Sequence, residues 1–179
     1  MKPEGKQFII VEMTAVSIQH YNTVPSQFAI EAIVQVNHEG SRFTIAETKL
    51  PQPHQIKIYP NEPWQPHGRH AVYFAMLGSR CTGQVYIQEY WNGMARVEDI
   101  RVDEAFRGKG IGRKLMDAAM NWAKAQGFSI VCLETQDINA AACRFYAAYG
   151  FVLSGVDYEV YETTGSKGET ALYWYCRIA

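Results

Sequence analysis

The stretch RGKGIGRKL, residues 107–115, decides how the rest of the sequence is interpreted. It places three glycines and four cations between a predicted strand and a predicted helix. A helix that begins in a glycine-rich turn exposes unpaired backbone N–H groups, its dipole favours anions, and glycine lets a phosphate approach without meeting a Cβ atom. The pattern therefore predicts a cradle for a diphosphate, although the same glycines could also serve only to shape a tight turn.

The residues on either side of this stretch have strong periodic patterns. Strands are predicted over 71–77, 84–91 and 94–102, and the pair Asn92-Gly93 indicates a hairpin because both residues tolerate positive φ. A helix is predicted from Gly112 to Gln126, with Gly127 as its C-terminal stop. Its apolar residues recur at helical spacing and are Ile111, Leu115, Ala119, Trp122 and Ala123.

The remaining elements complete an α+β pattern. A mostly apolar strand is predicted over 128–136, a helix over 140–149, and two closing strands over 151–162 and 169–178 around a GSKG turn. A meander, a helix, a strand, a helix and two closing strands form an α+β, or mixed α/β, arrangement. We therefore predict a single domain over residues 1–179.

The first seventy residues are more ambiguous. Residues 8–16 and 41–50 are rich in β-branched and aromatic side chains and predict strands, whereas residues 25–36 fit either a short helix or another strand. The proline-rich segment 51–70 excludes continuous regular structure. It predicts a loop that crosses to the sheet edge, with a linker between two domains as the alternative.

Composition and charge limit the class of protein. The chain has 179 residues, of which 47% are hydrophobic, and a net charge of −1, so a wholly basic surface for nucleic acid is not expected. Residues 101–124 hold six cations against three acids, whereas residues 151–175 hold four acids against one cation. No secretory signal, membrane span or C-x-x-C pair is found, and His67 and His70 lack an apparent third ligand. We therefore expect a cytoplasmic protein that binds neither a membrane nor a metal.

The order of motifs resembles the GNAT superfamily of N-acetyltransferases. Arg107, Gly110 and Gly112 match its arginine–x–x–glycine–x–glycine signature, and neither a Walker loop nor a Rossmann fingerprint fits this position. LET at 133–135, NAA at 139–141 and FYAAYGF at 145–151 follow in the family's order. The resemblance implies a GNAT-type fold, with a central, mostly antiparallel twisted sheet flanked by helices, and acetyl-CoA as co-substrate.

Within the superfamily, the sequence looks most like the streptothricin acetyltransferases. The similarity is carried by residues 97–128, by LET-x-x-x-NAA and by the closing stretch DYEVYETTGSKGETALYW, residues 157–174. It implies acetylation of the β-lysine amine of streptothricin, a cationic antibiotic, and hence resistance. Residues 1–69 would contribute to the acceptor site and residues 70–178 would form the acetyl-CoA-binding core.

Two alternatives to this function remain open at this point. The acceptor could instead be a protein terminus or lysine, a polyamine or another small amine, and the chain could also be a non-catalytic module that senses CoA. Dimers are common in the superfamily, so the resemblance also allows a homodimer.

The resemblance also assigns residues to the cofactor. The pyrophosphate would lie on the loop backbone, the pantetheine would pair like an extra strand with the strand before it, and Asn139 would contact the pantetheine arm. The residues so assigned are Ile100, Arg101, Val102, Arg107, Gly108, Lys109, Gly110, Ile111, Gly112, Arg113 and Asn139.

Tyr146 matches the family tyrosine that protonates the leaving thiolate, a role that suits a phenol because it stays protonated at neutral pH. A base is also required, because an ammonium has no lone pair for attack. Glu98 is the first choice and Asp99 the second, and Glu134 is the rival because some relatives that acetylate ribosomal proteins place their base at that position.

Strand periodicity and charge give two further expectations about these acids. A period of two places Arg96, Glu98, Ile100 and Val102 on one face of strand 94–102, and Asp99 and Arg101 on the other. For the acceptor, we assign Asp99, Asp157 and Glu159, because acids attract a polycation. These acids could equally be ordinary solvated surface.

Overall fold

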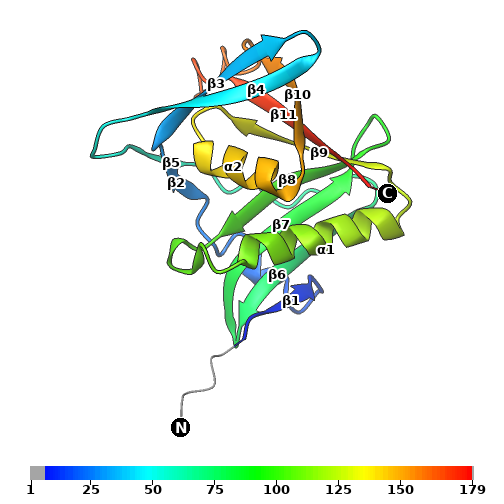
Figure 1. The fold of residues 1–179 in the computed structure, drawn as a ribbon. Helices are drawn as coiled ribbons and strands as arrows, with labels where there is room; N and C mark the ends of the chain where they lie inside the picture. Colours follow the sequence, from blue (N-terminus) through cyan, green and yellow to red (C-terminus); the bar gives the residue numbers. More distant parts are fainter. Residues whose placement is uncertain (1–6, 179) are drawn as a thin grey trace. The chain divides into compact units, whose positions relative to one another are not determined.

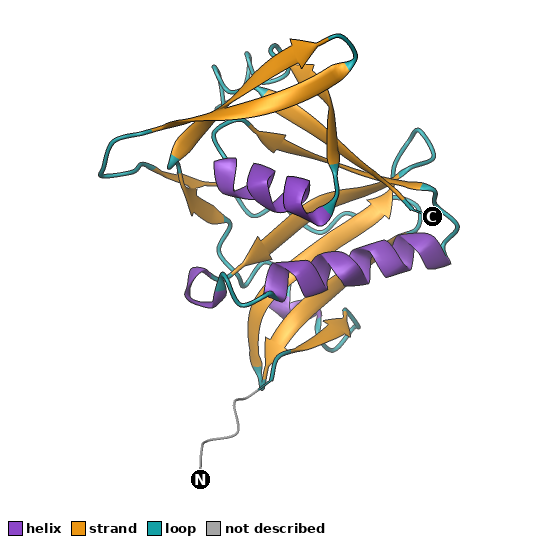
Figure 2. Cartoon of the chain, in the orientation of Figure 1, coloured by secondary structure: helices purple, strands orange, loops and turns teal. Residues whose placement is uncertain are grey.

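Antiparallel strands form most of the regular structure in the computed structural model, which describes residues 7–178 (Figures 1 and 2). Two α-helices and two short 3-10 helices interrupt them, which confirms the α+β class. In chain order the elements are β1 (Ile9–Glu12), η1 (Ile18–His20), β2 (Gln27–Ala29), β3 (Ala32–Glu39), β4 (Arg42–Lys49), β5 (Ile56–Ile58), β6 (His70–Leu77), β7 (Arg80–Glu89), β8 (Ala95–Val102), η2 (Glu104–Phe106), α1 (Ile111–Ala125), β9 (Ile130–Gln136), α2 (Ala140–Tyr149), β10 (Val152–Asp157) and β11 (Ala171–Arg177).

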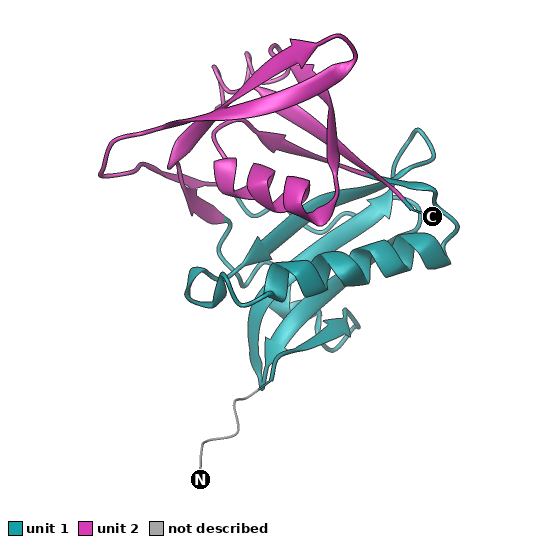
Figure 3. Cartoon of the chain, viewed as in Figure 1, with its two compact units in different colours: residues 1–26, 60–131, 178–179 teal, residues 27–59, 132–177 magenta. Residues whose placement is uncertain are grey.

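The chain divides into two compact units, each assembled from separate stretches of sequence (Figure 3). Unit 1 comprises Met1–Ser26, Pro60–Val131 and Ile178–Ala179, and unit 2 comprises Gln27–Tyr59 and Cys132–Arg177. The polypeptide therefore passes between the units after residues 26, 59, 131 and 177. Unit 1 contains the glycine-rich loop, and unit 2 contains the predicted acid, Tyr146.

Unit 1 is a four-stranded antiparallel arrangement in the order β1-β6-β7-β8, with α1 packed against its strands. Its buried side chains include Phe74, Val85 and Leu115. Gly83 lets the helix approach β7 closely, because a Cβ atom there would lie 2.9 Å from both Arg101 O and Leu115 Cδ1.

Helix α1 forms almost as predicted. Four of the five expected core residues are buried, and Trp122 is half-buried with its ring centroid 5.7 Å from that of Phe128. Gly127 follows the helix with φ of +80°, as expected of a C-terminal stop. The hairpin before α1 is confirmed too, but only Gly93 has positive φ there, while Asn92 Oδ1 accepts a hydrogen bond from Met94 N.

A β-bulge in β8 overturns the predicted division of its side chains between two faces. Tyr86 pairs with Asp99, but Ile87 pairs with Val97, so Glu98 is an extra residue on β8. Arg96, Asp99 and Arg101 lie opposite Gln88, Tyr86 and Gln84, which share one face of β7. Glu98 also lies on this face, because its Oε1 accepts from Gln88 Nε2 at 2.9 Å. Ile100 and Val102 lie on the other face, opposite Val85 and Gly83.

Unit 2 holds two two-stranded pairs, β2-β5 and β3-β4, and the strand order β9-β11-β10. Residues 25–36 thus form strands and not a helix, and β5 is a short strand within the proline-rich segment. Helix α2 packs against β3 and β10. The strand predicted over 151–162 is too long, because β10 ends at Asp157, whose Oδ1 accepts hydrogen bonds from the N–H groups of Glu159 and Val160 and closes a turn.

Among the described residues, the model has no helix that combines the length and the apolar character needed to cross a membrane.

Candidate functional site

The glycine-rich loop of unit 1 presents its backbone at the start of α1. Gly108 and Gly110 have φ of +73° and +78°, and a Cβ atom built on either glycine would meet no atom within 4 Å. Helix α1 begins at Ile111 directly after Gly110. The first N–H groups of a helix lack partners within it, and here they follow directly on two glycines that are surrounded by open space. These residues suit the diphosphate predicted from the sequence.

Two cations of this loop bond to its own carbonyl groups. Arg107 Nε donates to Val102 O at 3.1 Å, and Lys109 Nζ donates to Ala105 O at 3.0 Å and lies 5.0 Å from the centroid of the Phe106 ring. Both side chains therefore shape the turn between β8 and α1. They also keep positive charge next to the glycines, which favours an anion there.

An ion pair anchors the entrance to the loop. Arg80 Nη2 lies 2.6 Å from Asp103 Oδ2, and this hydrogen bond lowers the pKa of the Asp103 carboxyl. Asp103 Oδ1 also accepts from Ala105 N, so that it caps η2. The chain between β8 and the glycines is thereby fixed at both its side chains and its backbone.

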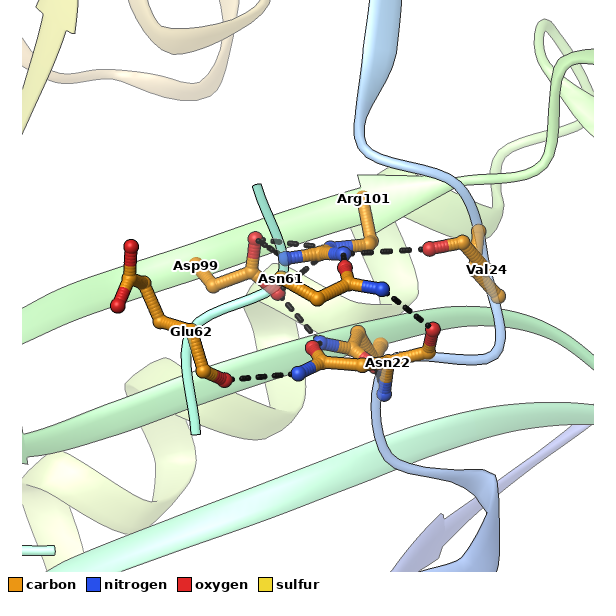
Figure 4. Close-up of polar contacts among 7 residues, drawn as sticks. Asn22, Val24, Asn61, Glu62, Asp99 and Arg101 are labelled. Atoms are coloured by element: carbon orange, nitrogen blue, oxygen red, sulfur yellow. Dashed lines mark hydrogen bonds and ion pairs between the residues drawn. The ribbon is translucent and has the colours of Figure 1, made fainter. Parts of the chain in front are cut away.

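Asp99 accepts several hydrogen bonds on the polar face of β8, the face that carries Arg96, Glu98, Asp99 and Arg101 (Figure 4). Arg101 Nε lies 3.0 Å from each carboxylate oxygen of Asp99, and Arg101 Nη2 lies 2.9 Å from Oδ1. Gln84, which is fully buried, donates from Nε2 to Asp99 Oδ2 at 2.6 Å. The Asp99 and Arg101 side chains are only 19% and 10% exposed, so this pair is a partly desolvated ion pair.

The Arg101 guanidinium also binds two segments that are distant in sequence. Its Nη1 donates to Val24 O at 3.2 Å and to Asn61 Oδ1 at 2.8 Å. Asn61 Nδ2 donates to Asn22 O, and Asn22 Nδ2 donates to Glu62 O, which closes the network in Figure 4. Arg101 was predicted only as a backbone partner of the cofactor, and its side chain joins residues 22–24, 61–62 and β8.

Glu98 has a different environment from its neighbour. Its Oε1 accepts from the uncharged amide of Gln88, and Arg96 Nε lies 3.4 Å from Oε2. The Glu98 side chain is 25% exposed. Arg96 is itself directed by Tyr90, because Nη1 donates to the Tyr90 hydroxyl at 2.9 Å and the guanidinium lies 4.8 Å from the Tyr90 ring centroid. Glu98 is thus oriented while part of its carboxylate stays accessible to solvent.

In unit 2, Tyr146 lies on α2 with 7% of its surface exposed. Its ring lies 6.2 Å from the Trp174 ring and 6.0 Å from the Phe151 ring, centroid to centroid. Phe145 and Tyr149, which the helical pattern marks as packing residues, are only half-buried. Tyr146 is therefore the most enclosed of the three aromatic residues on this helix.

The other predicted residues of unit 2 have definite structural partners. Asn139 caps α2, because its Oδ1 accepts from Ala142 N at 3.2 Å, and the amide NH2 group takes no part in that cap. Glu134 accepts a hydrogen bond from the Tyr161 hydroxyl. Burial, followed by this bond, raises the pKa of Tyr161, so the phenol stays protonated and continues to donate.

The two acids of unit 2 that we assign to the acceptor, Asp157 and Glu159, differ in their surroundings. Asp157 holds the turn that ends β10, whereas Glu159 is exposed. Another acid of the same loop, Glu169, pairs with Lys57, which also donates to Ser166. The charge of this segment is thus partly neutralised, and Glu159 is the exposed member of the assigned pair.

The sequence did not single out the amides that support the β8 acids. Gln84, Gln88, Asn22 and Asn61 all bond within the polar face or its network. A signal was present in QVYIQ, where Gln84 and Gln88 alternate with apolar residues at a period of two. Such polar residues on a strand beside an acidic strand indicate a shared polar face.

Comparison with known proteins identifies the family of this arrangement. The model of the Acetyltransferase (GNAT) family matches residues 40–151. Streptothricin acetyltransferase A of Bacillus subtilis (strain 168) is 32% identical over 175 residues, which cover 95% of this chain and 100% of the relative. The streptothricin acetyltransferase of Streptomyces lavendulae is 31% identical over 156 residues, which cover 82% of each chain.

Solved structures give the same result for the fold. A Bacillus anthracis str. Ames protein, described as a candidate streptothricin acetyltransferase and solved in complex with acetyl coenzyme A, has a TM-score of 0.88 at 28% identity. The match covers 96% of this chain and 100% of that protein. Nourseothricin acetyltransferase has a TM-score of 0.81 at 28% identity, with coverage of 96% and 99%. The predicted GNAT-type fold and its co-substrate, acetyl-CoA, are confirmed.

Gly110→Asp is expected to weaken acetyl-CoA binding at least about 10-fold more than Gly110→Asn, because only the former places a negative charge beside the diphosphate. Asn is the matched control, since it has the same shape and both side chains meet the same positive φ and open space. Calorimetric titration with acetyl-CoA measures both dissociation constants. Equal affinities of the two variants would argue against a diphosphate at the glycine-rich loop.

Asp99→Asn is expected to lower the free energy of unfolding by about 2 kcal/mol, because it removes the charged partner of Arg101 from a partly desolvated pair. Glu98→Gln is the control and is expected to cost less than about 0.5 kcal/mol, since Glu98 is more exposed and is not bound by a guanidinium in a bidentate way. Urea denaturation of the two variants checks the difference. Equal losses of stability would contradict the structural role given to Asp99.

Proposed function

We propose that this chain, which belongs to the Acetyltransferase (GNAT) family, acetylates a primary amine of streptothricin and thereby confers resistance to it. One observation carries the choice of acceptor. The similarity to the Bacillus subtilis streptothricin acetyltransferase extends over the whole of that relative, and so includes the segments outside the family core at residues 40–151. We take the segments outside residues 40–151 to be those that bear on the choice of acceptor.

The chain is an acetyl-CoA-dependent N-acetyltransferase. Acetyl-CoA supplies an acetyl group activated as a thioester. We propose that the backbone N–H groups of residues 108–113 hold its pyrophosphate, that the main chain of residues 100–102 pairs with its pantetheine, and that Asn139 contacts the pantetheine arm. The support is the open, positively charged start of α1, where no Cβ obstructs the approach of a phosphate.

Glu98 is the general base in this proposal. The acceptor ammonium must lose a proton before its nitrogen can attack the thioester carbon. Asp99 is a weaker choice, because a bidentate guanidinium and a buried amide already occupy its carboxylate. Glu134 remains the rival, although the Tyr161 hydroxyl already bonds to it. Glu98 is supported as the base by its contacts, because it is held by the neutral Gln88 amide and by one longer contact with Arg96 at 3.4 Å, and its side chain is 25% exposed.

Tyr146 is the general acid. As the new N–C bond forms and the C–S bond breaks, the electron pair of that bond passes to sulfur. The phenol of Tyr146 gives its proton to the sulfur. The nitrogen, which loses one proton to Glu98 before the attack, loses its second proton as the amide forms, and this proton restores the Tyr146 phenol. The protons thus balance without a covalent enzyme intermediate. The buried position of Tyr146 supports this role, because a dry environment strengthens its hydrogen bond to the developing thiolate.

On the acceptor side, we propose that residues 1–69 contribute to the site and that exposed Glu159 attracts the cationic substrate. Asp157 acts mainly by holding the turn that carries Glu159. The proposal also places the reaction in the cytoplasm.

Purified protein is expected to release CoA thiol rapidly from acetyl-CoA when streptothricin is present, and slowly with spermidine or a lysine-bearing peptide. Mass spectrometry of the antibiotic should show one added acetyl group. Rapid turnover with another amine would reassign the acceptor within the same enzyme class. Tight binding of acetyl-CoA without turnover of any amine would instead indicate the non-catalytic module.

Glu98→Gln and Tyr146→Phe are each expected to lower kcat about 100-fold or more, because proton transfer by a positioned side chain contributes about 10²- to 10⁴-fold. Glu134→Gln is the matched control and is expected to change kcat by less than about threefold. Steady-state kinetics at saturating acetyl-CoA measures the three variants. The opposite ranking of Glu98→Gln and Glu134→Gln would move the base to β9.

A further inference from the structure

The amide of Gln88 links Glu98 to two other parts of unit 1. Gln88 Oε1 accepts from the Tyr86 hydroxyl at 2.6 Å and from the His67 backbone N–H at 3.1 Å. Its Nε2 donates to Glu98 Oε1 at 2.9 Å. Gln88 is half-buried and lies on the polar face of β7, opposite Arg96. One side chain thus connects β7, the loop before β6 and the bulge of β8.

These contacts allow the Gln88 amide only one orientation. A backbone N–H group can only donate, so the atom facing His67 N must be the amide oxygen. Turning the amide over would set its NH2 group against that donor and would aim its oxygen at the Glu98 carboxylate. Both contacts would become repulsive, and the His67 N–H would lose its acceptor. Nε2 therefore always faces Glu98.

Tyr86 secures the same orientation from the core. Its side chain is 6% exposed and packs in a cluster with Val72, Phe74 and Met76. Burial, together with the charge of Glu98, raises the pKa of Tyr86 to about 12, so its hydroxyl keeps its proton at neutral pH and donates to Gln88. The ring is fixed by packing, and the hydroxyl in turn fixes the amide.

We infer that Gln88 is a positioning residue that holds the Glu98 carboxylate in the geometry needed to accept the proton of the acceptor amine. The inference rests on the proposed function, because it takes Glu98 as the base. Glu98 stands at a bulge, where the ladder between β7 and β8 is interrupted, and needs a support from a side chain. The neutral Gln88 amide gives that support at 2.9 Å, whereas the contact of Glu98 with the Arg96 guanidinium is longer, at 3.4 Å, than the contacts of Asp99 with Arg101.

The test is a double-mutant cycle between Gln88 and Glu98 in the full-length enzyme. Gln88→Met keeps the length of the side chain and removes both polar atoms. It is expected to lower kcat about 10- to 100-fold, with less than a twofold change in the dissociation constant for acetyl-CoA. In the Glu98→Gln background, the same substitution is expected to change kcat by less than about twofold, because the group it orients is absent.

Gln84→Met is the matched control, because it makes the same chemical change four residues away on the same face of β7 and removes a partner of Asp99. Its effect on kcat is expected to be the same in both backgrounds. Gln88→Glu gives a second readout. It retains an oxygen for Tyr86 and His67 but turns a second carboxylate toward Glu98, and it should lower kcat at least as much as Gln88→Met.

Three results would overturn the inference. The first is a wild-type kcat for Gln88→Met while Glu98→Gln is impaired, which would remove the role of Gln88 and leave the base in place. The second is an equal loss of kcat for Gln88→Met in both backgrounds, which would show that it acts through folding and not through Glu98. The third is a wild-type kcat for Glu98→Gln, which would remove the proposed base and the inference with it.

Discussion

The bulge in β8 is the constraint on which the polar face of unit 1 depends. In a regular strand, Glu98 would share a face with Ile100 and Val102, and a carboxylate would point toward the packed side of the sheet. The extra residue reverses the alternation. Apolar side chains then meet α1, whereas the polar face collects Arg96, Glu98, Asp99 and Arg101. The packing of α1 against β8 and the placement of the acids therefore follow from the same local irregularity.

The two adjacent acids on this face have different hydrogen-bond partners, and we propose different roles for them. Asp99 is bound by a guanidinium and a buried amide, and these contacts fix the strand and the segments next to it. Glu98 is held by the neutral Gln88 amide and by a longer contact with Arg96 at 3.4 Å, and its side chain is 25% exposed. A similar division is proposed at the glycine-rich loop. Arg107 and Lys109 bond to the carbonyl groups of Val102 and Ala105 and so shape the turn, whereas the role of binding the anion is proposed for the backbone N–H groups.

The sequence predicted the parts of the fold that are governed by local rules. Helix α1 was predicted because its apolar spacing and flanking glycines act within a few residues. The roles proposed for Gly110 and Tyr146 came from the family resemblance. The bulge could not be predicted from the sequence. Glu98 and Asp99 are consecutive acids, so the polar and apolar pattern of the strand does not show that one of them is an extra residue. The network around Arg101 was also missed, since it joins Val24, Asn61 and β8 across a wide separation in sequence.

The hydrogen bonds around Arg101 have a consequence for how the chain tolerates substitutions. Residues 22–24 and 61–62 stand just before and just after the segment 27–59, and three of the bonds that hold them end on backbone carbonyls, of Asn22, Val24 and Glu62. Backbone acceptors are present whatever the side chain. The bonds that join residues 22–24 and 61–62 to each other and to β8 therefore use no side chain of the segment 27–59, so substitutions within that segment leave them in place.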